Sequence, residues 1–151
     1  MTRLRSAQGR VFATGEARFT SHPAHAVDRL ARIRLQVHIG EVHAQAVLDT
    51  GGAYLVLSPE MAEEAKLGPP IHSDRIAIRG FVFTGSVHRI PVTIPADAGE
   101  PLTFEATAFV PELGAEEPWP LPSYLGWQGC LDRIRLAIDP GDERLYFGAV
   151  D

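Results

Sequence analysis

Apolar and polar residues alternate along much of this chain with the two-residue period that is typical of half-buried β-strands. The alternation is sharpest over residues 33–39, where Ile, Leu, Val and Ile occupy every second position between polar residues. The turn Gly40-Glu41 follows, and a second apolar run extends over residues 42–48. We therefore expect a β-hairpin over residues 32–47.

The same pattern predicts further strands and little helix. The expected strands cover residues 11–13, 17–20, 76–78, 87–94, 102–110, 134–139 and 144–147. A helix is expected to begin after Ser58, which is a favourable cap followed by a proline, and to end before Gly68. Residues 97–99 and 139–142 are expected to be turns. The chain is thus predicted to be an all-β protein with one or two short helices.

A length of 151 residues predicts one domain with its own core. We expect this domain to span residues 31–151, with residues 1–30 as an amino-terminal extension that is partly disordered or strand. Hydrophobic residues make up 45% of the chain and charged residues 22%, as in ordinary soluble proteins. Cys130 is the single cysteine, so no disulfide can form within the chain, and its apolar neighbours predict a buried, inert thiol.

Charge and hydropathy exclude several classes of partner. The net charge is -5 and no clustered basic face is visible, which makes nucleic acid a poor partner. No apolar stretch approaches the roughly 20 residues that a membrane-spanning helix needs. Arg3 and Arg5 are not followed by the apolar core of a signal peptide. The expectation is therefore a cytoplasmic protein that binds neither nucleic acid nor membranes.

Two pairs of histidines could suggest a metal site. His22 and His25 flank a proline with no cysteine nearby, an arrangement that is typical of surface residues. His38 and His43 flank the turn of the first hairpin, whose polar face accounts for both. We therefore expect no metal and no cofactor.

An acidic residue, a hydroxyl and two glycines interrupt the apolar run over residues 46–58, Ala-Val-Leu-Asp-Thr-Gly-Gly-Ala-Tyr-Leu-Val-Leu-Ser. An unpaired carboxylate in a simple buried strand would be costly, because it leaves water. Asp49 is therefore expected at a turn that joins a strand ending at Leu48 to a strand beginning at Tyr54. The residues alone leave two interpretations: an Asx turn in which Asp49 bonds its own backbone, or a loop that carries chemistry.

Asp49-Thr50-Gly51, with Val47-Leu48 before it and Gly52-Ala53 after it, resembles the active-site motif of the aspartic proteases. The commonest forms of that motif continue with Ala or Ser, so Gly52 is a departure. A hairpin before the motif, a short helix after it, Tyr124-Leu125-Gly126 and two closing strands are similar in order to those of the retroviral-type, single-lobed members. The resemblance covers residues 30–148 and implies a closed-barrel-like retropepsin (acid protease) fold.

The resemblance also implies roles for individual residues. Asp49 would be the general acid and base, Thr50 would hydrogen-bond across a two-fold axis, and Gly51 would let the backbone approach the carboxylate. Where the family has Ser in place of Gly52, its hydroxyl can contact the carboxylate, so Gly52 is expected to shift the pH optimum upward. Tyr124-Leu125-Gly126 would be a supporting element that crosses near the active-site loop.

A flap, which is a mobile hairpin that closes over substrate, is implied for the segment after residue 78. Its expected members are Gly80, Phe81, Val82, Phe83 and Gly85. The residues themselves leave another interpretation open, because Phe81 and Phe83 in an expected loop over residues 79–86 could instead pack on the domain. Trp119, in a proline-rich loop, could line a pocket or anchor its own loop.

Peptide hydrolysis by acid catalysis needs two carboxylates that share one proton. This chain offers one suitable acid, so the resemblance implies a homodimer in which Asp49 of each copy meets at a two-fold axis. The expected function is that of an aspartic endopeptidase, a hydrolase that acts on a peptide or protein substrate. The alternative is a catalytically inactive retropepsin-like dimerisation or peptide-binding module. Intact Asp49-Thr50-Gly51 favours the enzyme, whereas Gly52 and the irregular run over residues 127–130 favour the module.

Overall fold

The computed structural model describes residues 4–21, 32–115 and 117–151, so the interpretation of His22 and His25 lies outside the described residues. The strands are β1 (Leu4–Arg5), β2 (Val11–Ala13), β3 (Gly15–Arg18), β4 (Arg34–Ile39), β5 (Val42–Ala53), β6 (Leu55–Val56), β7 (His72–Ile78), β8 (Phe81–Ile94), β9 (Ala98–Gly99), β10 (Leu102–Pro111), β11 (Ser123–Gln128), β12 (Ile134–Asp139) and β13 (Arg144–Ala149). Within these ranges the helical elements are α1 (Pro59–Glu64) and η1 (Leu131–Arg133), a single turn of 3-10 helix. The prediction of an all-β protein with one or two short helices is confirmed.

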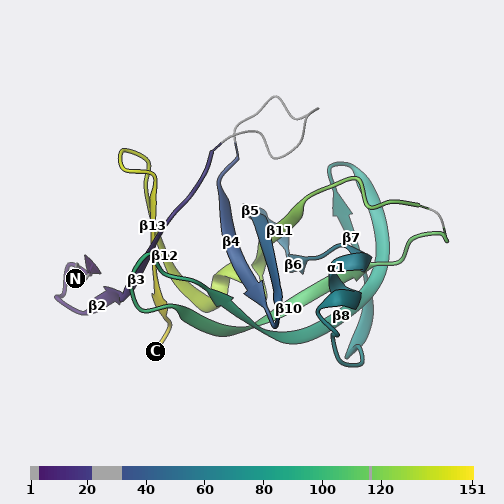
Figure 1. The fold of residues 1–151 in the computed structure, drawn as a ribbon, viewed down its shortest axis with the longest axis horizontal. Coiled ribbons are helices and arrows are strands. Elements are labelled where there is room, and N and C mark those ends of the chain that lie inside the picture. The colour runs from purple at the N-terminus through teal and green to yellow at the C-terminus, as the bar shows by residue number, and fades with distance from the viewer. Residues whose placement is uncertain (1–3, 22–31, 116) are drawn as a thin grey trace.

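The largest sheet closes on itself as a barrel (Figure 1). Its strands follow the order β10-β6-β11-β5-β4-β8, and β8 pairs in turn with β10, which completes the ring. The β8–β10 ladder is antiparallel and runs from the pair Ile94 and Leu102 to the pair Gly85 and Pro111. Strand β7 pairs with the first half of β8 and, among the described strands, with no other. The β7–β8 hairpin is therefore an arm of the barrel with one open edge.

A second, four-stranded sheet has the order β12-β13-β3-β9. Strand β3, from the expected amino-terminal extension, pairs with β13 near the other end of the chain. The short β1, which is the first strand among the described residues, pairs with β2. The prediction of a simple turn over residues 97–99 was wrong, because Ala98 and Gly99 form β9 against β3. The proposed domain boundary near residue 30 stays a prediction.

A large apolar cluster lies between the barrel and this second sheet. Alternate residues of β4 enter it, with Leu35, Val37 and Ile39 almost fully buried, as the alternation predicted. Leu145 and Phe147 of β13 are fully buried in the same cluster. Each such side chain contributes about 1.5–3 kcal/mol to folding through removal of its apolar surface from water. The first hairpin and the closing strands are therefore confirmed together with the face that each one buries.

Two local predictions hold in detail. Ser58 caps α1, and its hydroxyl accepts a hydrogen bond from the Met61 amide at 3.1 Å, while Pro59 occupies the first turn. At the turn between β12 and β13, the carboxylate of Asp139 accepts bonds from the amides of Gly141 and Asp142 at 2.9 and 3.3 Å. In both places the oxygen of a short polar side chain accepts a hydrogen bond from a backbone amide that lacks a partner in the helix or strand.

The prediction of a loop over residues 79–86 was wrong. Strand β8 begins at Phe81, and Phe81 to Val87 pair with β7 in antiparallel register. The turn is the two-residue segment Arg79-Gly80, whose φ angles of 50° and 81° lie in the left-handed region. Two residues with positive φ form the tight turn that suits the twist of a hairpin, so no longer loop is needed.

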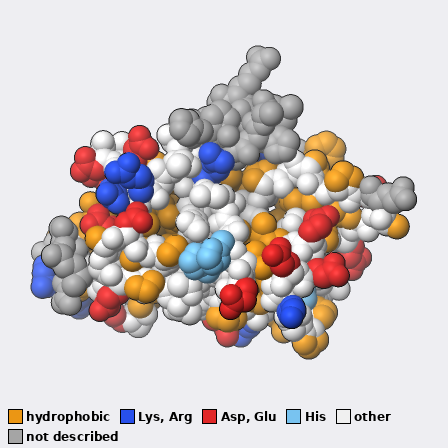
Figure 2. All heavy atoms as spheres, viewed as in Figure 1, with side chains coloured by type: hydrophobic (Ala, Val, Ile, Leu, Met, Phe, Trp, Pro, Cys, Tyr) orange, Lys and Arg blue, Asp and Glu red, His pale blue; other side chains and the backbone are white. Residues whose placement is uncertain are grey.

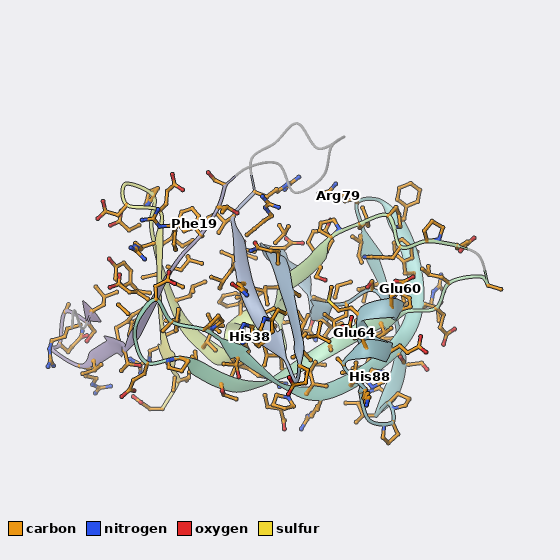
Figure 3. All side chains as sticks on the ribbon, in the orientation of Figure 1. Phe19, His38, Glu60, Glu64, Arg79 and His88 are labelled. Carbon is orange, nitrogen blue, oxygen red and sulfur yellow. The ribbon has the colours of Figure 1, made fainter. Side chains whose placement is uncertain are left out.

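The surface of the face shown in Figure 2 mixes charged, polar and apolar side chains. His38 and His43 are a cross-strand pair whose rings stack at 3.8 Å, and they form the histidine patch near the centre of this view. Glu60 and Glu64 of α1 lie on the side of the molecule that carries the β7–β8 hairpin (Figure 3). No helix among the described residues is long and apolar enough to span a bilayer.

Candidate active site

Strand β11 lies between β5, which contains Asp49, and β6, the next strand along the chain. It pairs in parallel with β5 and antiparallel with β6, so the chain from β5 to β6 wraps around it. The Gly126 amide donates to the Tyr54 carbonyl, and the Tyr54 amide donates to the Gln128 carbonyl, each at 2.8 Å. Gly126 is the register partner of Asp49. The sequence expectation that Tyr124-Leu125-Gly126 crosses near the Asp49 segment is therefore met.

The crossing leaves no space for a side chain at residue 126. A Cβ atom on Gly126 would lie 2.4 Å from the Tyr54 carbonyl oxygen and 2.7 Å from the carbonyl carbon of Ala53. Both are backbone atoms, which cannot turn aside as a flexible side chain can. Glycine is therefore required here by the close approach of two strands.

Asp49 lies inside β5 rather than at a turn, so the expectation that its strand ends at Leu48 was wrong. The reversal occurs at Tyr54, a non-glycine residue with a φ of 67°. The Asp49 side chain is only half-buried, which removes the cost that argued against a strand. Its Oδ1 accepts a hydrogen bond from the Gly51 amide at 3.2 Å. This is the Asx-type contact of the simpler interpretation, and it also fixes the orientation of the carboxylate.

Gly52 leaves room for that carboxylate. A Cβ atom at residue 52 would lie 2.7 Å from Asp49 Oδ2 and 3.1 Å from its Cγ. Any larger residue would therefore have to move the carboxylate from its present position. Thr50 and Gly51 are exposed, so the segment reaches the surface immediately beside Asp49.

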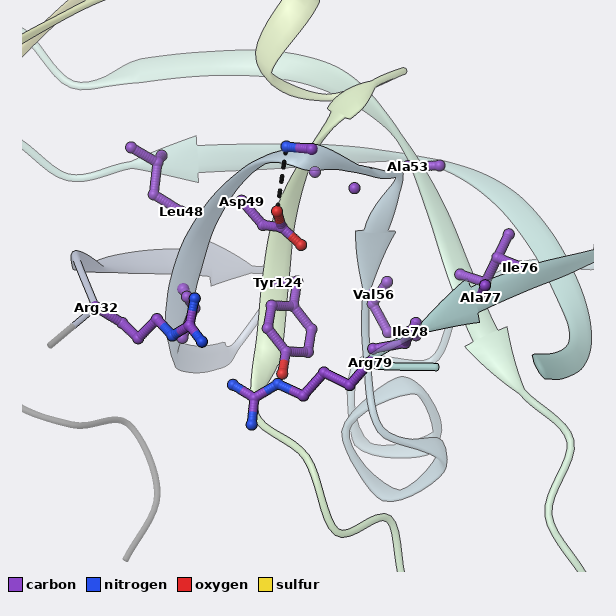
Figure 4. A pocket seen from close by; sticks show the side chains of 14 residues that line it. Arg32, Leu48, Asp49, Ala53, Val56, Ile76, Ala77, Ile78, Arg79 and Tyr124 are labelled. Carbon is purple, nitrogen blue, oxygen red and sulfur yellow. Dashed lines mark hydrogen bonds between the residues drawn. The ribbon is translucent and has the colours of Figure 1, made fainter. Parts of the chain in front are cut away.

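A pocket of about 290 Å³ opens in front of Asp49 (Figure 4). Strand β5 supplies Asp49 and its neighbours on one side, and Tyr124 and Gly126 of β11 form part of the wall. Ile76 and Ile78 of β7 line the side formed by the hairpin. The pocket therefore lies between the Asp49 segment and an arm of the barrel with an open edge, and polar and apolar groups share its walls.

The five residues expected in a flap belong to this hairpin but do not line the pocket. Phe81 and Val82 are 68% and 60% exposed on the far strand. Phe83 packs edge-on against Trp119 with ring centroids 5.1 Å apart, which makes Trp119 an anchor for that strand. The remaining two are Gly80, in the turn, and Gly85, where a Cβ would collide with the Phe109 ring and the Val110 backbone.

The sequence interpretation missed that β7, rather than the start of β8, is the strand of the hairpin that lines the pocket. Ile76 and Ile78 are register partners of Phe83 and Phe81, so all four side chains share one face of the hairpin. The alternation of Ile76 and Ile78 about Ala77 was the signal that could have identified β7 as this side.

Tyr54 connects the Asp49 segment to the base of the hairpin. Its hydroxyl donates to Asp74 Oδ2 at 2.7 Å. This hydrogen bond, together with burial and the negative charge of Asp74, raises the pKa of Tyr54 above its ordinary value. The same bond, helped by the Arg75 amide, lowers the pKa of Asp74. No local sequence pattern predicts this contact, because its two partners are 20 residues apart.

Cys130 is buried in the apolar core, as the sequence predicted. Burial is the main cause that raises the pKa of its thiol to about 12, so the reactive thiolate is scarce at neutral pH. Among the described residues, no group of three His, Cys, Asp or Glu side chains is arranged to hold a metal ion.

Three features together define a retropepsin-like fold. They are the closed barrel, the strand β11 that pairs with β5 beside the Asp-Thr-Gly segment, and the β7–β8 hairpin that borders the pocket. Solved structures agree. A retropepsin-like aspartic protease from Rickettsia conorii matches 89% of this chain and 98% of its own, with a TM-score of 0.51 and 19% identity. Basic 7S globulin from soybean matches 91% of this chain and 50% of its own, with a TM-score of 0.55 and 11% identity.

A third similar structure is the retroviral protease-like domain of Ddi1 from Leishmania major, at a TM-score of 0.46 and 15% identity over 78% of this chain and 94% of its own. No protein-family model and no curated protein sequence matches the chain. The likeness to the first two structures, at 19% and 11% identity, establishes the fold and leaves the chemistry to be argued from the residues themselves.

Proposed function

We propose that this protein is an aspartic endopeptidase that hydrolyses peptide bonds as a homodimer. The observation that carries the proposal is the position of Asp49. It lies at the strand crossing, half-buried, oriented by the Gly51 amide and facing a pocket of about 290 Å³. A carboxylate used only as a turn former does not need such a pocket.

In the proposed reaction two Asp49 carboxylates, one from each copy, share one proton, because two like charges about 3 Å apart cannot both ionise. The ionised carboxylate takes a proton from water as the water oxygen bonds to the peptide carbonyl carbon. The protonated carboxyl donates a hydrogen bond to the carbonyl oxygen. A proton then reaches the amide nitrogen as the C–N bond breaks.

The surroundings of Thr50 support the pairing of two copies. Thr50 is exposed, and it lines a second cavity of about 360 Å³ whose other walls include Trp127 and Ile138. These two large apolar side chains are 53% and 44% exposed. Apolar surface next to the segment that must meet its symmetry mate suits a self-complementary interface. Thr50 would then hydrogen-bond across the two-fold axis.

The β7–β8 hairpin is proposed to act as the flap. Ile76 and Ile78 would contact substrate side chains, and the open edge of β7 offers backbone donors and acceptors to an extended peptide. The Tyr54–Asp74 hydrogen bond would hold the base of this hairpin while its tip moves. Substrate would bind between the flap and the paired Asp49 carboxylates.

The test is cleavage of a mixed peptide library between pH 4 and pH 7 by three proteins. These are the wild type, Asp49→Asn, and Asp142→Asn as a matched control at an exposed turn. Cleavage by the wild type and the control, with none by Asp49→Asn, is the expected result. Equal behaviour of Asp49→Asn and the wild type would reject the enzyme and favour the peptide-binding or dimerisation module.

A further inference from the structure

Two histidines lie directly opposite each other on the first barrel hairpin. His38 of β4 and His43 of β5 are register partners, and their rings stack with centroids 3.8 Å apart and planes 11° apart. His43 is exposed and His38 is half-buried, so solvent reaches the pair on the face shown in Figure 2. Neither residue lines the pocket of Asp49. The pair is therefore separate from the proposed active site and takes no part in the proposed reaction.

The separation of the two rings suits one metal ion. Imidazole nitrogen binds Zn²⁺ at about 2.0–2.1 Å, so two nitrogens on the same ion can be at most about 4.2 Å apart. Rings stacked at 3.8 Å hold equivalent nitrogens within that limit when both present the same edge. The lone pairs of parallel rings run side by side, so each ring must turn about χ2 toward the ion. Torsions of this kind have broad minima, and both rings border solvent, so such a turn is open to them.

The amide beside His38 fits an unprotonated ring. Gln36 lies on the same face of β4, and its Nε2 is 3.5 Å from His38 Nε2. With the amide in this orientation its N–H can only donate, so His38 Nε2 is the acceptor. A nitrogen with a free lone pair is what metal coordination requires.

We propose that His38 and His43 form a binding site for a transition-metal ion of the Zn²⁺, Cu²⁺ or Ni²⁺ kind. Imidazole favours these ions, whereas Mg²⁺ and Ca²⁺ prefer oxygen ligands. The protein supplies two ligands and water supplies the others, since no group of three His, Cys, Asp or Glu side chains surrounds one point among the described residues. The sequence alone predicted no metal here, because the polar face of the hairpin accounts for both histidines.

A bound ion links β4 to β5 close to the turn of their hairpin. The two-residue segment Gly40-Glu41 joins the strands just beyond the histidine pair, and β5 continues from His43 to Asp49. The ion therefore stabilises the strand that carries Asp49 without contacting a substrate. An ion that binds the folded state and not the unfolded chain raises the stability by mass action, so Tm should increase with the metal concentration.

The experiment is thermal unfolding of the tag-free protein at pH 7.5 with zinc chloride, and with magnesium chloride for comparison. Isothermal titration calorimetry gives the dissociation constant for zinc and should give one ion per chain. At a hundredfold excess of zinc over that constant, we expect Tm to rise by roughly 5–11 °C. The rise should shrink at pH 5.5, where protons compete for the imidazole nitrogens. Magnesium should leave Tm unchanged.

His38→Gln and His43→Gln are each expected to remove the zinc-dependent rise in Tm, because a single imidazole remains. His72→Gln is the matched control, since His72 is an exposed histidine on β7, outside this hairpin. The His22→Gln/His25→Gln double variant tests the two histidines outside the described residues. Both the control and the double variant should keep the rise.

Three results would overturn the proposal. The first is a wild-type Tm that does not change with zinc at millimolar concentration. The second is a zinc-dependent rise that persists in either single variant of the pair, and the third is a rise that disappears in the double variant, because both would place the ion elsewhere. Each readout is independent of peptide cleavage, so the metal site can fail or succeed whatever the outcome for the peptidase function.

Discussion

Replacing Gly126 with alanine is expected to destabilise the fold and to disturb Asp49. The new Cβ would lie 2.4 Å from the Tyr54 carbonyl oxygen, about 1 Å closer than ordinary contact, and 2.7 Å from the backbone of Ala53. The two strands must separate at the point where Gly126 pairs with Asp49. Overpacking of this kind costs about 1–3 kcal/mol, and we expect the upper end because both obstacles are backbone.

The assay is thermal unfolding at one fixed protein concentration, because an oligomer unfolds in a concentration-dependent manner. A loss of about 3 kcal/mol in a chain of this size lowers Tm by roughly 6–12 °C. The matched control is Gly68→Ala, since nothing lies within 4 Å of a Cβ at that exposed position. A Tm for Gly126→Ala within about 1 °C of both the wild type and the control would refute the argument that the crossing requires glycine.

Three further predictions concern the surroundings of the site. Tyr54→Phe removes the donor that lowers the pKa of Asp74, and a lowered carboxyl pKa stabilises the fold at pH values above the unfolded pKa, a contribution that is lost as the pH falls through the folded pKa. Urea unfolding should therefore show a lower free energy of unfolding for Tyr54→Phe than for the wild type at about pH 6, with a difference that shrinks toward pH 2. A difference that does not change with pH would contradict this. Cys130, with its pKa raised to about 12, should react with Ellman's reagent at pH 8 only after unfolding; rapid labelling of the native protein would show that the thiol is accessible. Gly52→Ser should lower the rate of peptide cleavage, because its Cβ displaces the Asp49 carboxylate. It should also move the pH optimum of cleavage downward, since a serine hydroxyl at this position can contact the carboxylate. Superimposable pH–rate profiles of the variant and the wild type would contradict the expected pH shift.

The elements that were predictable from the sequence are those whose signals are local. The alternation of apolar and polar residues over residues 33–39 predicts a strand with one buried face, and β4 buries that face. Ser58 and Pro59 predict the start of a helix, and α1 begins at Pro59. Each of these signals depends on neighbours within a few residues, so one sequence is sufficient to detect it.

The elements that were not predictable depend on partners far along the chain. Strand β5 continues past Asp49 because β11, more than 70 residues later, supplies its hydrogen bonds. Phe83 belongs to a strand that pairs with β7 and packs against Trp119 from a distant loop, whereas the local glycines at residues 80 and 85 predicted a loop over residues 79–86. Ala98 and Gly99 form a strand because β3 lies beside them. Non-local pairing outweighs local preference in each case.

The candidate site divides in the same way. The Asp-Thr-Gly segment and Tyr124-Leu125-Gly126 were identified by their residues, and the structure brings them into register. The hairpin residues that line the pocket were missed, because the turn was placed too late by several residues. The Tyr54–Asp74 contact joins two segments that only the folded chain brings together.

The central claim is that Asp49 of two copies forms one catalytic pair. The most direct measurement is peptide cleavage by mixed dimers, prepared by unfolding and refolding the wild type together with Asp49→Asn. Random pairing predicts that activity per wild-type chain falls to about one half at equal amounts and to about one fifth at a fourfold excess of the variant. Activity per wild-type chain that does not change with added Asp49→Asn, in mixtures shown to exchange subunits, would contradict the shared pair.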